Sequence, residues 1–261
     1  ILMNICVLIK QVPDKDSSLN IGDDQLTLID NNITWVSNES DNYALEEALL
    51  LKEKHGGEVI ACTLGKDSAR QVLKDALAKG ADRGIFISDS SFDNLDVLSL
   101  GKVIASTLEK ENFDLIMTGL QSDDQGNSQL GLILAELLNM SHGSLVMGTE
   151  IIDDSTIRVK KELEGGWFQW TKLSLPASIS IQSGINSPRY ATLKGIMMVK
   201  KKTVDDVTAS DISSDALESN VTINKIYVPD KTKETQFIEG SPEEISEKLV
   251  ELFKNDIKVL N

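Results

Sequence analysis

The sequence contains few of the residues that usually build metal and redox centres. Among its 261 residues are two cysteines and two histidines, and their spacing matches no metal or redox motif. Cys6 and Cys62 lie in short apolar runs, which is typical of small core residues. His55 is expected near the end of a helix and His142 in a loop. The sequence therefore predicts no metal site.

Signatures of common nucleotide-dependent and hydrolytic enzymes are absent from the sequence as well. There is no Gly-x-Gly-x-x-Gly fingerprint, no Walker loop and no Gly-x-Ser-x-Gly nucleophile elbow. Neighbouring acids such as Asp123 and Asp124 point apart on a loop, so they do not form an acid–base pair. Because no nucleophile, base and metal come together, we expect a protein that is not an enzyme on its own.

Long hydrophobic runs are missing, and the charge is strongly of one sign. No apolar run approaches the roughly 20 residues that a membrane-spanning helix needs, and residues 5–9 are too few for a signal peptide. The net charge of −15 repels the phosphates of nucleic acid and of anionic lipid. We therefore expect no nucleic-acid binding and no membrane insertion. We expect a location in a bacterial or archaeal cytoplasm, or in the mitochondrial matrix.

The hydrophobic pattern of residues 1–140 predicts an α/β fold. Short apolar runs alternate with longer amphipathic ones, and such strands need helices over both faces of a parallel sheet. We expect strands at 4–9, 59–64, 84–87 and 115–118, and helices within 43–54, 72–77, 97–108 and 130–137.

The pattern changes in the second half of the chain. Two strand-like runs, 156–163 and 167–173, are joined by a glycine-containing turn and predict a small β-hairpin, and 177–182 predicts another buried strand. We expect an α/β domain over 1–212 and a C-terminal arm over 213–261. The arm is polar until a helix after Ser241, which can cap it. A lone amphipathic helix must dock on its own domain or on a partner subunit.

The densest cluster of small and polar residues follows the strand at 115–118 and precedes the helix at 130–137. It therefore lies at the carboxyl end of a strand and at a helix N-terminus, where open parallel sheets bind ligands. Backbone amides and the helix dipole favour a phosphate there, although carboxylates in the loop oppose it. The pattern is consistent with a nucleotide site or with a plain polar loop. The candidate residues of this Gly119 loop are Gly119, Leu120, Gln121, Ser122, Asp123, Asp124, Gln125, Gly126, Asn127, Ser128, Gln129 and Leu130.

Two further segments combine residue types that suggest a binding role in addition to a structural one. Residues 38–41 (Asn38, Glu39, Ser40 and Asp41) precede the helix that starts near Tyr43 and read as a helix cap, but sheet topology could bring them beside the Gly119 loop. Residues 186–202 join an apolar stretch to a lysine cluster. That combination suggests a docking surface, or a surface loop followed by a strand with a charged end.

These segments, in this order, resemble the beta subunit of electron transfer flavoproteins. The resemblance runs from about residue 4 to residue 212, and its most diagnostic stretch is Asn-Ser-Pro-Arg-Tyr-Ala-Thr-Leu at 186–193. The other matching segments are 7–14, 43–49, 76–83, 119–131, 161–166 and 175–177.

The resemblance implies an adenine-nucleotide-hydrolase-like, Rossmann-type domain without hydrolase activity. It implies a heterodimer in which an alpha subunit holds the redox FAD, while the beta subunit buries an AMP. Leu8, residues 38–41, Leu64 and the Gly119 loop would surround the AMP. The complex would carry electrons from acyl-CoA or related dehydrogenases to a quinone-linked oxidoreductase.

The resemblance also implies how the chain meets its partners. Leu193 would anchor a recognition loop, near 183–203, that grips dehydrogenases, and Glu162 would pair with an arginine of the alpha subunit. The C-terminal helix would embrace that subunit. The remaining candidates for partner contact are Arg189, Tyr190, Ile196 and Met197.

The sequence departs from the family pattern at two places. Lys15 stands where many relatives carry a tyrosine that touches the flavin, and residues 38–41 lack the usual proline and aromatic residue. The stretch 10–14 also occurs in electron-bifurcating relatives, which hold a second FAD instead of AMP, although 122–127 does not resemble their loop. A nucleotide-binding regulatory module without a redox role and an ATP-using enzyme are further hypotheses for this fold.

Overall fold

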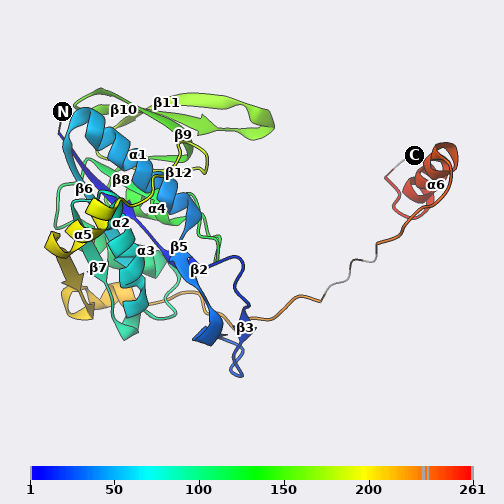
Figure 1. Cartoon of the computed structure of the whole chain (residues 1–261), viewed down its shortest axis with the longest axis horizontal. Coiled ribbons are helices and arrows are strands. Elements are labelled where there is room, and N and C mark those ends of the chain that lie inside the picture. The colour runs from blue at the N-terminus through cyan, green and yellow to red at the C-terminus, as the bar shows by residue number, and fades with distance from the viewer. Residues whose placement is uncertain (1, 231–232, 234, 260–261) are drawn as a thin grey trace. The chain divides into compact units, whose positions relative to one another are not determined.

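The computed structural model describes residues 2–230, 233 and 235–259, which fall into two compact units, Ile1–Lys225 and Ile226–Asn261. Within the described part of the first unit, nine strands form one sheet in the order β11-β10-β9-β12-β8-β1-β6-β7-β13, with helices on both faces (Figure 1). The α/β fold with a mostly parallel sheet is confirmed.

The centre of the sheet is parallel, as the apolar runs predict. Neighbouring strands here pair in parallel, and crossovers that contain a helix lead from β1 to β6 and from β6 to β7. These strands are β1 (Met3–Leu8), β6 (Gly57–Leu64), β7 (Arg83–Ile87), β8 (Leu115–Gly119), β12 (Ala177–Ile181) and β13 (Val204–Val207).

One edge of the sheet extends into the predicted hairpin. β9 (Ser141–Asp153) pairs in parallel with β12. β10 (Thr156–Glu162) and β11 (Phe168–Ser174) follow by antiparallel pairing and form the arm of the sheet seen beyond β9 in Figure 1. The expectation that His142 lies in a loop is wrong, because this residue is in β9 and its partner across the ladder is Ser178.

Two layers of helices enclose two hydrophobic cores. α1 (Glu39–His55) and α2 (Arg70–Lys79) cover one face, and α3 (Val97–Leu108) and α4 (Leu130–Leu137) cover the other. Cys6 and Cys62 are buried in the second core, as predicted. Each core removes apolar side chains from water, which is the main force that holds helices on a sheet.

The strand order reverses between β1 and β8. From β1 the chain moves to β6 and β7 on one side, and it then returns to β8 and β12 on the other. In an open parallel sheet, such a switch point leaves a crevice outside the carboxyl ends of the two strands, and ligands bind there. The fold therefore directs attention to the loops that follow β1 and β8.

Several short elements go beyond the sequence prediction. Two small ladders join β2 (Gln11–Pro13) to β5 (Trp35–Ser37) and β3 (Asn20–Ile21) to β4 (Leu28–Ile29). Short 3-10 helices lie at Asp30–Asn32, Asp67–Ala69, Ser90–Phe92, Glu164–Gly166, Val199–Lys201, Ala209–Asp211 and Ser214–Leu217.

Residues 186–202 contain a helix instead of the strand that was one expectation for them. α5 (Leu193–Met198) is capped by Thr192, whose hydroxyl oxygen accepts from the amide of Gly195 at 3.0 Å. The nearest strand, β13, begins only at Val204.

The second unit contains the predicted C-terminal helix. α6 (Pro242–Asn255) begins with a capping box, in which Ser241 and Glu244 each bind the other's backbone amide. No residue of α6, all of which the structure describes, is buried. No helix in the described residues has the length and apolar character needed to cross a bilayer.

Candidate functional site

A buried carboxylate joins the two strands at the switch point. Asp41, in the first turn of α1, accepts hydrogen bonds from the amide of Lys10 at 2.8 Å and from the amide of Gly119 at 2.9 Å. Lys10 follows the end of β1, and Gly119 is the last residue of β8. Only 6% of Asp41 is exposed, so it holds the two strand ends from inside the domain.

The environment of Asp41 opposes its negative charge. Burial raises the pKa of Asp41 to about 6, while the hydrogen bonds from Lys10, Asn38 and Gly119 limit that rise because they stabilise the charged form. At neutral pH the carboxylate is therefore mostly ionised, and both of its oxygens accept from backbone amides.

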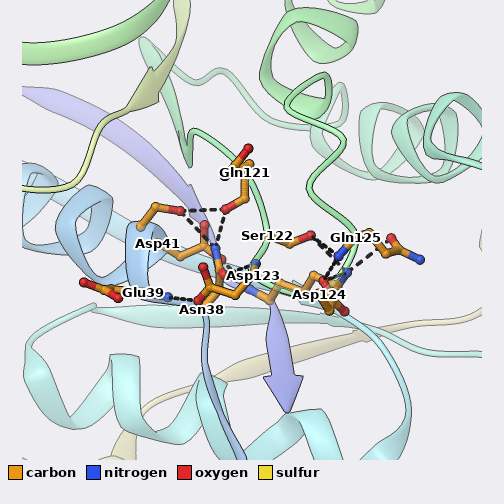
Figure 2. A network of polar contacts seen from close by, with 10 residues as sticks. Asn38, Glu39, Asp41, Gln121, Ser122, Asp123, Asp124 and Gln125 are labelled. Atoms are coloured by element: carbon orange, nitrogen blue, oxygen red, sulfur yellow. Dashed lines mark hydrogen bonds and ion pairs between the residues drawn. The ribbon is translucent and has the colours of Figure 1, made fainter. Parts of the chain in front are cut away.

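The segment before α1 holds the Gly119 loop. Asn38 Nδ2 donates to the carbonyl of Gln121 at 2.9 Å, and Asn38 Oδ1 accepts from the amide of Asp123 at 2.9 Å. Ser40 donates to the same carbonyl at 2.8 Å (Figure 2). Asn38 is the N-cap residue of α1, in line with the interpretation of this segment as a helix cap, but its side chain makes no cap hydrogen bond and reaches across to the loop instead. The expected proximity of residues 38–41 to the Gly119 loop is confirmed.

The two acids of the loop have partners. Asp124 lies 2.7 Å from the ammonium of Lys10, and Asp123 accepts from the amide of Glu39 at the positive end of α1 (Figure 2). These contacts offset much of the negative charge that would oppose a phosphate. Sequence reasoning missed Lys10 as a site residue, although its position directly after a buried strand was a usable signal.

The N-terminus of α4 has no side-chain cap. Its N-cap residue, Gln129, makes no side-chain cap hydrogen bond, so the first amides of the helix lack that partner. Gly126 and Ser128 have φ of 60° and 54°, and this left-handed backbone turns the loop sharply before the helix. Exposed amides at a helix start form a ready site for a phosphate group.

Thr118 adds an unsatisfied polar atom beside the start of α4. Its hydroxyl is buried and has no hydrogen-bond partner among the described residues. A Cβ atom on Gly131 would lie 2.9 Å from this hydroxyl and 2.5 Å from the hydroxyl of Ser180, so the backbone of α4 approaches closely. Buried polar atoms are normally paired, so an orphan here fits a polar ligand or a water. Nothing in the sequence distinguished Thr118 or Ser180.

The remaining candidates around the loop lie at the same edge of the sheet. Leu8 and Leu64 are at the ends of β1 and β6, on the face covered by α3 and α4, where an apolar base could contact them. Ser128 donates to the side-chain carbonyl of Gln121 at 2.9 Å. The loop is otherwise mostly exposed; its exposed members are Gln121, Asp123, Asp124, Gln125, Gly126, Asn127, Ser128 and Gln129, with Leu120, Ser122 and Leu130 half-buried.

A hollow elsewhere on the domain is less suited to a nucleotide. It has a volume of about 520 Å³ and lies near the amino ends of β8 and β12, at the opposite edge of the sheet from the Gly119 loop. Its lining includes the acids Glu109, Glu111 and Asp114, which repel phosphate. We therefore locate the candidate nucleotide site at the Gly119 loop, from the strand order of the sheet and the hydrogen-bonding groups of the loop, and not in this hollow.

The candidates for partner contact fall into three groups. Tyr190, Leu193, Ile196 and Met197 are exposed on residues 186–202, which we name the docking segment. Arg189 turns inward instead and pairs with carboxylates of α1. Glu162, on β10, is half-buried and accepts from Gln182 at 3.0 Å.

Comparison with known proteins identifies the family. The family model described as the electron transfer flavoprotein domain matches residues 25–212. The chain belongs to the electron transfer flavoprotein beta-subunit family. It is 31% identical to the electron transfer flavoprotein subunit beta of Methylophilus methylotrophus, over 98% of this chain and 99% of that protein.

Other beta subunits of electron transfer flavoproteins are similar over most of the chain. The Bacillus subtilis subunit is 32% identical over 99% of this chain and 100% of its own length. The Mus musculus subunit is 33% identical over 85% of this chain and 88% of its own length. The matched family region includes α1, the Gly119 loop, the hairpin and the docking segment.

Proposed function

We propose that this chain is the beta subunit of a heterodimeric electron transfer flavoprotein and that it binds AMP as a structural ligand. The observation that carries the proposal is the uncapped start of α4 at the switch point of the sheet, in a chain of this family. Two independent features support a nucleotide there: the orphan hydroxyl of Thr118 and the paired acids of the loop.

The residues of the site fit an adenylate. The phosphate would bind the backbone amides of residues 127–130, where the helix dipole is positive. The base would lie against the apolar ends of β1 and β6, at Leu8 and Leu64. Asp41, Asn38 and Ser40 would hold the loop in place behind the nucleotide.

The chain would act by binding and positioning, with no covalent or acid–base step of its own. FAD, held mainly by the alpha subunit at the interface, would supply the redox chemistry of the complex. We propose that α6 and Glu162 contact the alpha subunit. The amphipathic α6 has no buried residue, and such a helix is stabilised by a partner surface.

The docking segment would bind the electron donors. Electrons would arrive from dehydrogenases of the acyl-CoA type and leave to a quinone-linked oxidoreductase. A small, exposed apolar face around Leu193 suits a carrier that must release each partner quickly, because weak redox encounters bury little surface.

Co-expression with an alpha subunit tests the proposed function. The proposal predicts a yellow heterodimer with one subunit of each kind, because the alpha subunit brings FAD. A colourless homo-oligomer that leaves the alpha subunit unbound would contradict it and favour a nucleotide-binding module without a redox role.

Leu193→Ala tests the docking role. The substitution removes most of an exposed apolar side chain, so we expect slower reduction of the heterodimer by an acyl-CoA dehydrogenase. We expect a reduction in kcat/KM of about tenfold, which corresponds to about 1.4 kcal/mol, with unchanged AMP and FAD content. Leu50→Ala, at an exposed residue of α1, is the matched control. A normal rate in Leu193→Ala would remove the docking role.

A further inference from the structure

The start of the docking segment is tied to α1. Asn186 Nδ2 donates to the carbonyl of Tyr43 at 3.1 Å and to the carboxylate of Glu47 at 3.0 Å. Glu47 in turn accepts from the hydroxyl of Thr149 on β9. The first residue of the segment is therefore connected to both a helix and the sheet.

Arg189 forms the next and most extensive connection. Its Nε lies 2.8 Å from Glu46 Oε2 and its Nη2 lies 2.9 Å from Glu46 Oε1, a two-pronged contact with one carboxylate. Its backbone amide also donates to Glu46, at 3.0 Å, and its Nη1 lies 2.5 Å from Glu53 Oε1. The side chain of Glu46 is 7% exposed and that of Arg189 is 32% exposed, so the carboxylate of this contact is shielded from water while the guanidinium is partly exposed.

The end of the docking segment is tied to α2. Lys202 Nζ donates to the carbonyls of Leu77 at 2.7 Å and Ala81 at 2.5 Å, at the carboxyl end of that helix. A Cβ atom on Gly195 would lie 2.1 Å from the carbonyl oxygen of Ala78, so α5 packs directly on α2 (Figure 1).

α1 is a firm base for these contacts. Ala44, Leu45, Ala48 and Leu49 on its inner face are buried in the first core. Its first turn carries Asp41, which is bound to the ends of β1 and β8. A group that is fixed to α1 is therefore fixed to the whole sheet.

The outer face of the docking segment has no such support. Tyr190, Leu193 and Met197 are 93%, 82% and 76% exposed. α5 is six residues long, and an isolated helix of that length is unstable in water. The position of its apolar face must come from the contacts that hold the segment to the domain.

We propose that Arg189 is a positioning residue, which holds the docking segment on Glu46 and Glu53 of α1 so that its apolar face is preformed before a partner arrives. This inference rests on the proposed function, and it assigns Arg189 to contacts within the chain and not to contact with the partner. A preformed face lowers the ordering cost of each encounter, which matters for a carrier that binds and releases repeatedly.

The chemistry of the contact requires arginine. The planar guanidinium presents several donors in a fixed fork, which matches two carboxylates at once, whereas a lysine ammonium is a point charge. The hydrogen bonds that Arg189 donates to Glu46 and Glu53 raise the pKa of Arg189, and the bond that Glu53 accepts lowers the pKa of Glu53. Arg189 and Glu53 therefore remain charged at neutral pH.

Two variants separate positioning from folding. Arg189→Lys keeps the charge and loses the fork. The double variant Arg189→Ala/Glu46→Gln removes both partners, so that no lone carboxylate stays buried. Arg70→Ala is the matched control, because Arg70 also bridges two acids, Asp67 and Asp206, at the opposite end of α2.

The test uses the holo heterodimer as electron acceptor for a purified acyl-CoA dehydrogenase. If the preformed face is present in about one tenth of the double-variant molecules, KM for the flavoprotein rises about tenfold while kcat stays within about twofold. We expect a smaller rise in Arg189→Lys and none in Arg70→Ala. Hydrogen exchange of residues 186–199 should become faster in the double variant, with nucleotide content unchanged.

Combination with Leu193→Ala completes the test. We expect Leu193→Ala to add less to KM in the double variant than in the parent, because both changes act on the same face. An unchanged KM in the double variant, together with a raised KM in Leu193→Ala, would overturn the positioning role alone. An unchanged KM in Leu193→Ala itself would overturn both the positioning role and the docking surface that it serves.

Discussion

Replacing Asp41 with asparagine removes the buried carboxylate that joins the ends of β1 and β8. The amides of Lys10 and Gly119 share its two oxygens, and an asparagine offers one oxygen and one NH₂ group. One amide therefore loses its acceptor, but the folded protein no longer buries a negative charge. The two effects depend differently on pH, so they can be separated.

The magnitude follows from the pKa of Asp41. Burial raises this pKa from 3.8 to about 6, so the folded state holds the proton more tightly than the unfolded state. Stability from this group is fully present below the unfolded pKa and is lost as the pH rises through the folded pKa. At 1.36 kcal/mol per pKa unit, the full shift corresponds to about 3 kcal/mol, and about 2 kcal/mol of it is lost between pH 4 and pH 7. Asp41→Asn lacks this loss.

Urea unfolding of the wild-type and variant chains at constant ionic strength, from pH 4 to pH 7, measures the effect. The free energy of unfolding of the variant minus that of the wild type should rise by about 2 kcal/mol over this range. Asp154→Asn, on the exposed turn between β9 and β10, controls for the loss of one negative charge. If the difference in unfolding free energy between Asp41→Asn and the wild type does not change with pH, the conclusion that burial destabilises the ionised carboxylate of Asp41 is refuted.

Two further substitutions test the site and the arm. Gly131→Ala places a Cβ atom 2.5 Å from the hydroxyl of Ser180, so we expect a loss of about 1–3 kcal/mol in unfolding free energy and faster release of AMP, measured by thermal denaturation and nucleotide analysis. Leu132→Ala, exposed on the same helix, should retain AMP. Ser241→Ala removes the cap of α6 and should weaken that helix by about 1 kcal/mol, seen as faster hydrogen exchange of residues 242–255; unchanged exchange would contradict the capping role.

The sequence predicted the elements whose pattern is set by burial. β1, β6 and β8 are continuous apolar runs because both of their faces are covered, and α3 and α4 show helical spacing because one face is covered. The hairpin was predictable from its glycine turn, where Gly165 and Gly166 have positive φ.

Elements that depend on tertiary contacts were not predictable in this way. β9 has 13 residues, but its buried members are Gly143 and Val146, so it lacks the alternation that marks a strand. α5 forms because Thr192 caps it and Gly195 allows it to approach α2. The packing of both elements joins segments distant in sequence, and local pattern does not encode it.

The sequence predicted where the candidate site lies, but not the side-chain contacts within it. A polar loop after a buried strand indicated the Gly119 loop, because strand ends in parallel sheets bind ligands. The hydrogen-bond and ion-pair partners of Asn38 and Lys10 were not predictable, because each partner lies more than 80 residues away in sequence. The orphan hydroxyl of Thr118 also depends on the close approach of α4.

Identification of the nucleotides released from the denatured, purified heterodimer tests the central claim most directly. The account places an adenylate at the start of α4 and a flavin mainly in the alpha subunit. Mass spectrometry should therefore find AMP and FAD in equal amounts. FAD without AMP, or two FAD molecules for each heterodimer, would contradict the account.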